Sequence, residues 1–80
     1  MRIGYTLYAR RRMTQRRVSE QDVRHALENY FERISTPKNS MRYRGPAPDG
    51  RTLKVWVFPD AHPGAGKVVK TVAWDGVDDE

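Results

Sequence analysis

The hydrophobic pattern of this chain changes its period once, near Ile34, and this change limits the folds that the chain can adopt. Before Ile34, apolar residues recur three or four positions apart, as on one face of a helix. After it, apolar and polar residues alternate, as in strands with one buried face. Because 80 residues make one domain, helices followed by strands predict an α+β fold in a single domain, residues 1–80.

The second of two predicted helices covers residues 19–35. Ser19 can cap its N-terminus, and Asp22, three residues later, suits its first turn. Apolar residues at helical spacing then define its inner face: Val23, Ala26, Leu27, Tyr30, Phe31 and Ile34. Pro37 ends this helix by residue 36 at the latest.

The first predicted helix covers residues 7–16, with Thr6 as its N-cap. Its inner stripe is narrow and consists of Tyr5, Ala9 and Met13. Since only Arg17 and Val18 separate this helix from Ser19, we expect the two helices to pack together as an N-terminal helical hairpin. Residues 2–5 could form a short edge strand, but so few residues do not decide it.

Alternation predicts strands over residues 40–45, 52–58 and 67–74, which would form a three-stranded antiparallel sheet beneath the hairpin. An acidic tail, residues 75–80, follows. We expect the face that meets the helices to carry Leu53, Val55, Val57, Val69, Thr71 and Ala73. The opposite face would carry Lys54, Trp56, Phe58, Lys70 and Trp74. The reverse assignment, with both tryptophans in the core, stays open, because alternation does not decide which face is buried.

Positive charge is concentrated in the N-terminal half. Of the 15 Lys and Arg residues, eleven lie in the first 44 positions, where only four acidic residues oppose them. Five arginines fall within residues 10–17 without an interleaved acid. Like charges one turn apart on a helix cost a few tenths of a kcal/mol per pair. Phosphates or sheet carboxylates are therefore the expected reason for them, although a solvated basic face that serves solubility is the alternative.

The basic residues fall into groups that suit RNA. On the first helix, Tyr8, Arg12 and Arg16 share one face, and Arg10 and Arg17 lie on another. Basic residues interleaved with an aromatic ring on an open sheet suit single-stranded RNA, because bases stack on rings while cations hold phosphates. The predicted RNA-binding residues are Arg10, Arg17, Arg42, Arg44, Lys54, Trp56 and Lys70. A homodimer contact is another use for the open sheet face.

Several classes of protein are excluded or unsupported. The chain has no cysteine, so it has no disulfide framework and no Cys-based zinc site. No metal-site spacing of histidines or carboxylates occurs, so neither a metal nor another cofactor is expected, and His25 and His62 are expected to be packing and loop residues. No apolar run approaches the ~20 residues that cross a bilayer. We expect a soluble cytoplasmic protein without a membrane partner.

The opening segment, residues 5–19, resembles the opening motif of a bacterial family, domain of unknown function 4258, whose pattern is approximately T-x-H-A-x-x-R-M-x-x-R-x-[IV]-S. Residues 42–45, 53–57 and 68–72 also fit this family. The resemblance marks six positions: Ala9, Arg12, Met13, Arg16, Ser19 and Thr71. It implies the small RelE/barnase-like fold of toxins that are metal-independent ribonucleases or ribosome-dependent mRNA interferases.

The resemblance also implies a catalytic set, Tyr8, Arg12 and Arg16. The two arginines would stabilise the phosphorane formed when RNA is attacked by its own 2′-hydroxyl, with Tyr8, Lys54 or Lys70 assisting. The family histidine falls on Tyr8 here, and a phenol is a poor base at neutral pH, although it donates hydrogen bonds. Three functions therefore remain open: a ribonuclease, a non-catalytic RNA- or ribosome-binding module, and a domain that binds an acidic protein such as an antitoxin.

Overall fold

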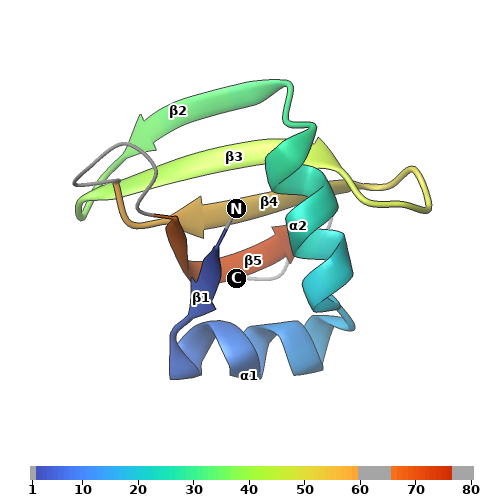
Figure 1. Ribbon diagram of the computed structural model, residues 1–80, viewed down its shortest axis with the longest axis horizontal. Helices are drawn as coiled ribbons and strands as arrows, with labels where there is room; N and C mark the ends of the chain where they lie inside the picture. Colours follow the sequence, from blue (N-terminus) through green and yellow to red (C-terminus); the bar gives the residue numbers. More distant parts are fainter. Residues whose placement is uncertain (1, 60–65, 77–80) are drawn as a thin grey trace.

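The computed structural model describes residues 2–59 and 66–76, which form two helices and one five-stranded sheet (Figure 1). The elements are β1 (Ile3–Tyr5), α1 (Leu7–Arg16), α2 (Glu20–Glu28), β2 (Glu32–Thr36), β3 (Ser40–Pro46), β4 (Thr52–Val57) and β5 (Lys67–Trp74). The strand order is β1-β5-β4-β3-β2. All neighbours are antiparallel except β1 and β5, which run parallel.

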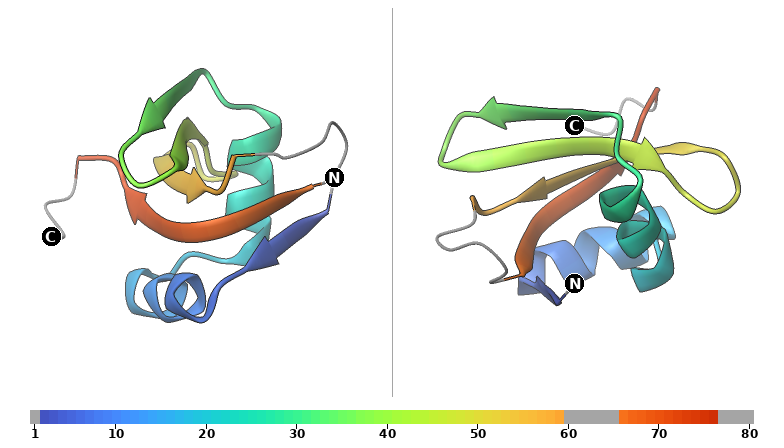
Figure 2. Two further views of the ribbon diagram at one scale, coloured as in Figure 1. Left: turned by 90° about the vertical axis from the view of Figure 1, so that its left-hand side faces the viewer. Right: turned by 45° about the horizontal axis from the view of Figure 1, so that its top comes forward.

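The fold is α+β, but the predicted helical hairpin on a three-stranded antiparallel sheet is wrong. The sheet is mixed and has two further strands, β1 and β2, at its edges. The helices pack on different strands instead of forming a hairpin: α1 on β5, and α2 on β3 and β4 (Figures 1 and 2). The short link between the helices therefore turns the chain from one part of the sheet to another.

The second helix ends at Glu28 rather than at residue 35, because the following residues pair with β3. The Asn29 amide closes the last turn on the His25 carbonyl, and the Phe31 amide already donates to Arg44 in β3. Tyr30, Phe31 and Ile34, expected in the core, are 46%, 59% and 40% exposed. Their helical spacing in the sequence does not produce a helix, since the chain bonds to β3 from Phe31 onward and β-strand pairing holds Glu32–Thr36 extended.

The first helix, α1, packs on β5 and follows β1 in the chain, with only Thr6 between them. Thr6 caps it by accepting from the Ala9 amide at 3.0 Å, as the sequence predicts, and also donates to the Lys70 carbonyl at 3.3 Å. At the other end, the Arg16 guanidinium donates to the Val72 carbonyl at 2.6 Å, and Trp74 Nε1 donates to the Arg16 carbonyl at 2.7 Å. These contacts attach α1 to the edge of β5 at both ends.

The second helix begins at the predicted cap. Ser19 Oγ accepts from the Asp22 amide and Asp22 Oδ2 accepts from the Ser19 amide, both at 3.0 Å, which makes a capping box. The helix then approaches β3 so closely that a Cβ on Gly45 would lie 2.2 Å from the Ala26 carbonyl oxygen. Only glycine fits there, and this contact seats α2 on the sheet.

The core lies on the face of the sheet that α2 covers, and a β-bulge decides which residues of β5 enter it. Trp56 pairs with Thr71, but Val57 pairs with Val69, so Lys70 is an extra residue in β5. The extra residue shifts the alternation by one. Val72 and Trp74, not Thr71 and Ala73, therefore lie opposite Val55 and Leu53 on the core face. Trp74, predicted on the open face, is only 7% exposed.

Two of the predicted segments lie largely outside the described residues: the loop before β5, which contains His62, and the acidic tail from residue 77 onward. The start of the tail is described, and the Asp75 amide donates to the Thr52 carbonyl at 3.0 Å. Between residues 2 and 59 and between 66 and 76, no helix is long and apolar enough to cross a membrane.

Candidate functional site

A groove of about 390 Å³ lies where the start of α1, the β2–β3 turn and the open faces of β3, β4 and β5 meet. Figure 2 (left) looks toward this end of the molecule, with the β2–β3 turn, β5 and α1 in view. We call it the Lys70 groove. Its lining residues are Tyr8, Thr36, Pro37, Lys38, Ser40, Trp56, Lys70 and Thr71.

Lys70 is held in place by the strands around it. Its Nζ donates to Ser40 Oγ at 2.6 Å and to the Lys38 carbonyl at 2.9 Å, and it lies 4.8 Å from the centre of the Phe58 ring. Because Lys70 is the extra residue of the bulge, both it and Thr71 line the groove. An ammonium has three N–H donors, so these two hydrogen bonds leave one donor for a ligand.

Tyr8 and Arg12 form a pair at the side of the groove contributed by α1. Arg12 Nε donates to Tyr8 Oη at 2.7 Å, and the guanidinium lies 4.8 Å from the centre of the Tyr8 ring. Arg12 Nη1 also donates to Gln15 Oε1 at 3.2 Å. Since the phenol oxygen accepts from Arg12, its own O–H is left to donate. The pair thus offers one hydroxyl donor and one positive charge.

Trp56 forms the aromatic floor of the groove. It lies on the open face of β4, between Arg42 of β3 and Thr71 of β5 in the strand register, and is partly exposed. Lys54 Nζ lies 5.8 Å from the centre of its ring. An exposed ring surrounded by cations is the arrangement that stacks nucleic-acid bases without regard to sequence.

The carboxylates of the described residues are all engaged away from the Lys70 groove. Three make ion pairs, Arg10–Glu20, Arg24–Glu28 and Arg51–Asp49, with N–O distances of 2.5, 3.6 and 2.7 Å. Asp22 caps α2, and the remaining two, Glu32 and Asp75, pair with arginines of β3. Because none of these six lines the groove, the charges of Lys38 and Lys70 are not neutralised there by any described carboxylate.

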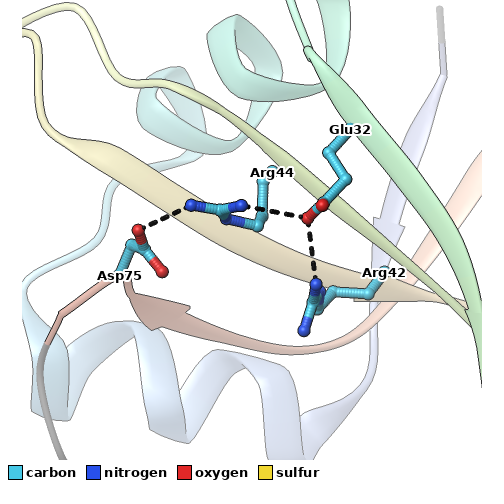
Figure 3. A network of polar contacts seen from close by, with 4 residues as sticks. All are labelled: Glu32, Arg42, Arg44 and Asp75. Atoms are coloured by element: carbon cyan, nitrogen blue, oxygen red, sulfur yellow. Dashed lines mark hydrogen bonds and ion pairs between the residues drawn. The ribbon is translucent and has the colours of Figure 1, made fainter.

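Arg42 and Arg44, which the sequence predicts as RNA-binding residues, make ion pairs with Glu32 and Asp75 (Figure 3). Glu32 Oε1 accepts from Arg42 at 2.9 Å and from Arg44 at 3.1 Å, and Arg44 also donates to Asp75 at 2.9 Å. The hydrogen bonds from Arg44 and Arg42 lower the pKa of Glu32 below its ordinary value of 4.5. Two cations thus meet two carboxylates, and this cluster holds no excess positive charge.

The other predicted residues on α1 do not line the groove. Arg10 stacks on the Tyr5 ring at 4.3 Å and pairs with Glu20, whereas Arg16 binds the backbone of β5. Arg17 is the C-cap of α1, in the left-handed conformation with φ 55°. Of the predicted residues, the structure therefore brings together Tyr8, Trp56 and Lys70, with Arg12 and Lys54 next to them.

Besides Thr71, which only the family resemblance marks, four lining residues were not predicted as site residues: Thr36, Pro37, Lys38 and Ser40. They come from β2, β3 and the turn between them, where Lys38 and Asn39 have φ values of 66° and 58°. The available signal was the Pro37-Lys38-Asn39 run, which is typical of a turn between strands.

The described residues that line the groove offer few groups that could take part in catalysis. Neither a histidine nor a carboxylate is among its described lining residues, and His25 Nδ1 instead lies 2.7 Å from the Pro46 carbonyl oxygen. In the described part of the chain, no group of three or more histidines and carboxylates could hold a metal ion. The groove can bind an anion beside an aromatic ring, and the acidic groups among its described lining residues are the phenol of Tyr8 and the ammonium groups of Lys38 and Lys70.

A family model described as domain of unknown function (DUF4258) matches residues 5–74. No curated protein matches the chain, and no solved structure does. The match to the family model extends from β1 to the end of β5 and takes in the whole lining of the Lys70 groove, so the chain belongs to the DUF4258 family.

Proposed function

We propose that this protein binds single-stranded RNA in the Lys70 groove. The observation that carries the proposal is the meeting of Lys70 and Trp56 in one groove that no described carboxylate lines. A single strand presents phosphates and unpaired bases together, and such a groove offers a partner for each. Arg12 and Lys54, next to the lining residues, extend the positive surface on either side.

The proposal favours RNA over an acidic protein because of Trp56. An acidic partner such as an antitoxin would be recognised mainly by the cations, whereas single-stranded RNA also uses the ring, because its unpaired bases stack there. The stacking surface is partly exposed and lies between strands, so it is rigid and needs little ordering when a base arrives.

A second candidate is the metal-independent ribonuclease activity that the resemblance to toxin-related proteins implies. The pair formed by Arg12 and Tyr8 favours it, because a cation and a hydroxyl donor next to Lys70 could stabilise the phosphorane and protonate the leaving 5′-oxygen. The 2′-hydroxyl must also lose a proton, and the described lining contains neither a histidine nor a carboxylate to accept it. Binding without cleavage is therefore the first proposal.

Binding is tested with a short fluorescent single-stranded RNA over a range of salt concentrations from about 50 mM. We expect Lys70→Ala and Arg12→Ala each to weaken binding and to reduce the slope of log K against log salt by about 0.7, as expected when one phosphate contact to a single strand is lost. Arg24→Ala removes the same charge from α2, behind the sheet, and should keep the wild-type slope. Equal losses in all three variants would mean that net charge, not the groove, binds the RNA.

Cleavage is tested with the same RNA in a metal chelator, with the products examined for 2′,3′-cyclic phosphate ends. The first proposal predicts intact RNA. Cyclic ends that disappear in Arg12→Ala would establish the ribonuclease instead, and a 2′-deoxy substitution at the cut should then prevent cleavage. If no RNA binds at low salt, both candidates fail and an acidic protein becomes the partner to seek.

A further inference from the structure

We infer that the Lys70 groove is a subsite for one nucleotide, with the base stacked on Trp56 and the phosphate bound by Lys70. This inference rests on the proposed RNA binding and adds the unit that the groove recognises. A volume of about 390 Å³ is at the small end of ligand pockets, which suits a single nucleotide rather than several. The rest of the RNA strand would then cross the surface outside the groove.

The contacts of Lys70 define the part of the groove that would bind the phosphate. Ser40 and the Lys38 carbonyl fix its ammonium from the side of β3, so the remaining N–H is directed without further ordering of the side chain. Two neutral acceptors hold this lysine, and neither cancels its charge. A charge that is held but not neutralised binds a phosphate oxygen more strongly than a mobile surface lysine does.

Trp56 and the threonine hydroxyl groups that also line the groove define the part that would bind the base. In the strand register Thr71 lies beside the ring, and Arg42 lies on its other side, held there by Glu32. Thr36 Oγ1 is buried and has no hydrogen-bond partner among the described residues, although Thr36 lines the groove. A rotation of this side chain would give a bound nucleotide a hydroxyl partner and remove an unsatisfied polar group.

The experiment uses the two tryptophans of the intact protein, whose indole N–H signals are followed by NMR. Trp56 lines the groove, whereas Trp74 is buried and donates to the Arg16 carbonyl, so Trp74 serves as an internal reference. A Trp56→Phe variant assigns the signals. We expect 5′-AMP to shift the Trp56 indole signal and to leave the Trp74 signal in place. Adenosine and inorganic phosphate, each carrying half of the recognition, should bind at least fivefold more weakly than 5′-AMP.

Two variants test the assigned roles. Lys70→Ala should abolish the advantage of 5′-AMP over adenosine, and Trp56→Ala should weaken 5′-AMP at least fivefold, whereas Trp56→Phe should keep most of the affinity because a ring remains. Far-UV circular dichroism of each variant confirms that it is folded.

The outcomes separate this inference from the proposed function. If RNA binds but 5′-AMP leaves the Trp56 signal unmoved, the nucleotide subsite is refuted and RNA binding stands. If 5′-AMP binds and RNA does not, the subsite stands and the protein is a receptor for free nucleotides. Equal effects of 5′-AMP and inorganic phosphate would reduce the groove to a simple anion site and overturn the inference.

Discussion

At the scale of single residues, Gly45 is a position where the fold allows no side chain. A Cβ there would lie 2.2 Å from the carbonyl oxygen of Ala26, which belongs to the backbone of α2 and cannot rotate away. Gly45→Ala should therefore lower the free energy of unfolding by about 1–3 kcal/mol, as overpacking does, when measured by urea denaturation. Gly4→Ala is the control, because its Cβ would meet Val68 Cγ2 at an ordinary 3.8 Å. Equal stability of the two variants would contradict the close approach of α2 and β3.

Glu32 gives the stability a dependence on pH. Its pKa is lower in the folded protein than the ordinary 4.5, because Arg44 and Arg42 hydrogen-bond its ionised form. Ionised Glu32 therefore stabilises the fold above about pH 4.5, and this stabilisation is lost as the pH falls through the lower folded value. The free energy of unfolding of Glu32→Gln should be lower than that of the wild type at neutral pH and should fall less steeply below about pH 4.5.

The control for this prediction is Glu28→Gln, which removes an exposed carboxylate whose pair with Arg24 spans 3.6 Å. It should keep the wild-type pH dependence. Some dependence also remains in Glu32→Gln, because hydrogen bonds from Arg51 lower the pKa of Asp49. Identical pH profiles for Glu32→Gln and the wild type would show that the cluster in Figure 3 does not form in solution.

At the scale of elements, the capping box decides where α2 begins. Ser19→Ala removes the hydroxyl that accepts from the Asp22 amide, and should cost about 1 kcal/mol of folding free energy. Ser35→Ala, on the exposed edge strand β2, should change stability by less than about 0.5 kcal/mol. Both values are obtained from urea denaturation followed by circular dichroism. If the Ser19→Ala variant were as stable as Ser35→Ala, the Ser19 cap would not stabilise α2.

The sequence predicts the elements whose signals are local. The caps Thr6 and Ser19 mark the helix starts, and alternation marks the three central strands. The edge strand β2 could not be found this way, because Tyr30, Phe31 and Ile34 fit helical spacing equally well. Its extended form depends on pairing with β3 and on the hydrogen bonds that Glu32 accepts from Arg42 and Arg44, which no local pattern reveals.

The bulge explains the error on the sheet faces. A strict alternation through β5 predicts Thr71 in the core and Trp74 outside, but the extra residue Lys70 reverses the phase beyond it. The same irregularity lets Lys70 and Thr71 both line the groove. The chemistry of Trp56 and Lys70 and the family resemblance at Tyr8 single out three of the lining residues from the sequence. Thr36 could not be found, because the sequence predicts a helix up to the turn beside it, and Ser40 could not, because nothing local shows that this turn folds toward Lys70.

At the scale of the whole molecule, the distribution of charge matters more than its sum. The chain carries a net charge of +5, but five of the six described carboxylates pair with Arg10, Arg24, Arg51 and the arginines of β3. The Lys70 groove, on the open face, is left positive. A basic chain attracts RNA to its whole surface, and we expect the Lys70 groove to retain it.

The most direct test of this claim is an NMR titration of the protein with short single-stranded RNA, followed through the backbone amide signals. Binding in the groove predicts the largest shifts there, around residues 8–12, 36–40, 54–56 and 70–71, and small shifts in α2, behind the sheet. Shifts that centre instead on α2, or that spread evenly over all the arginines, would contradict it.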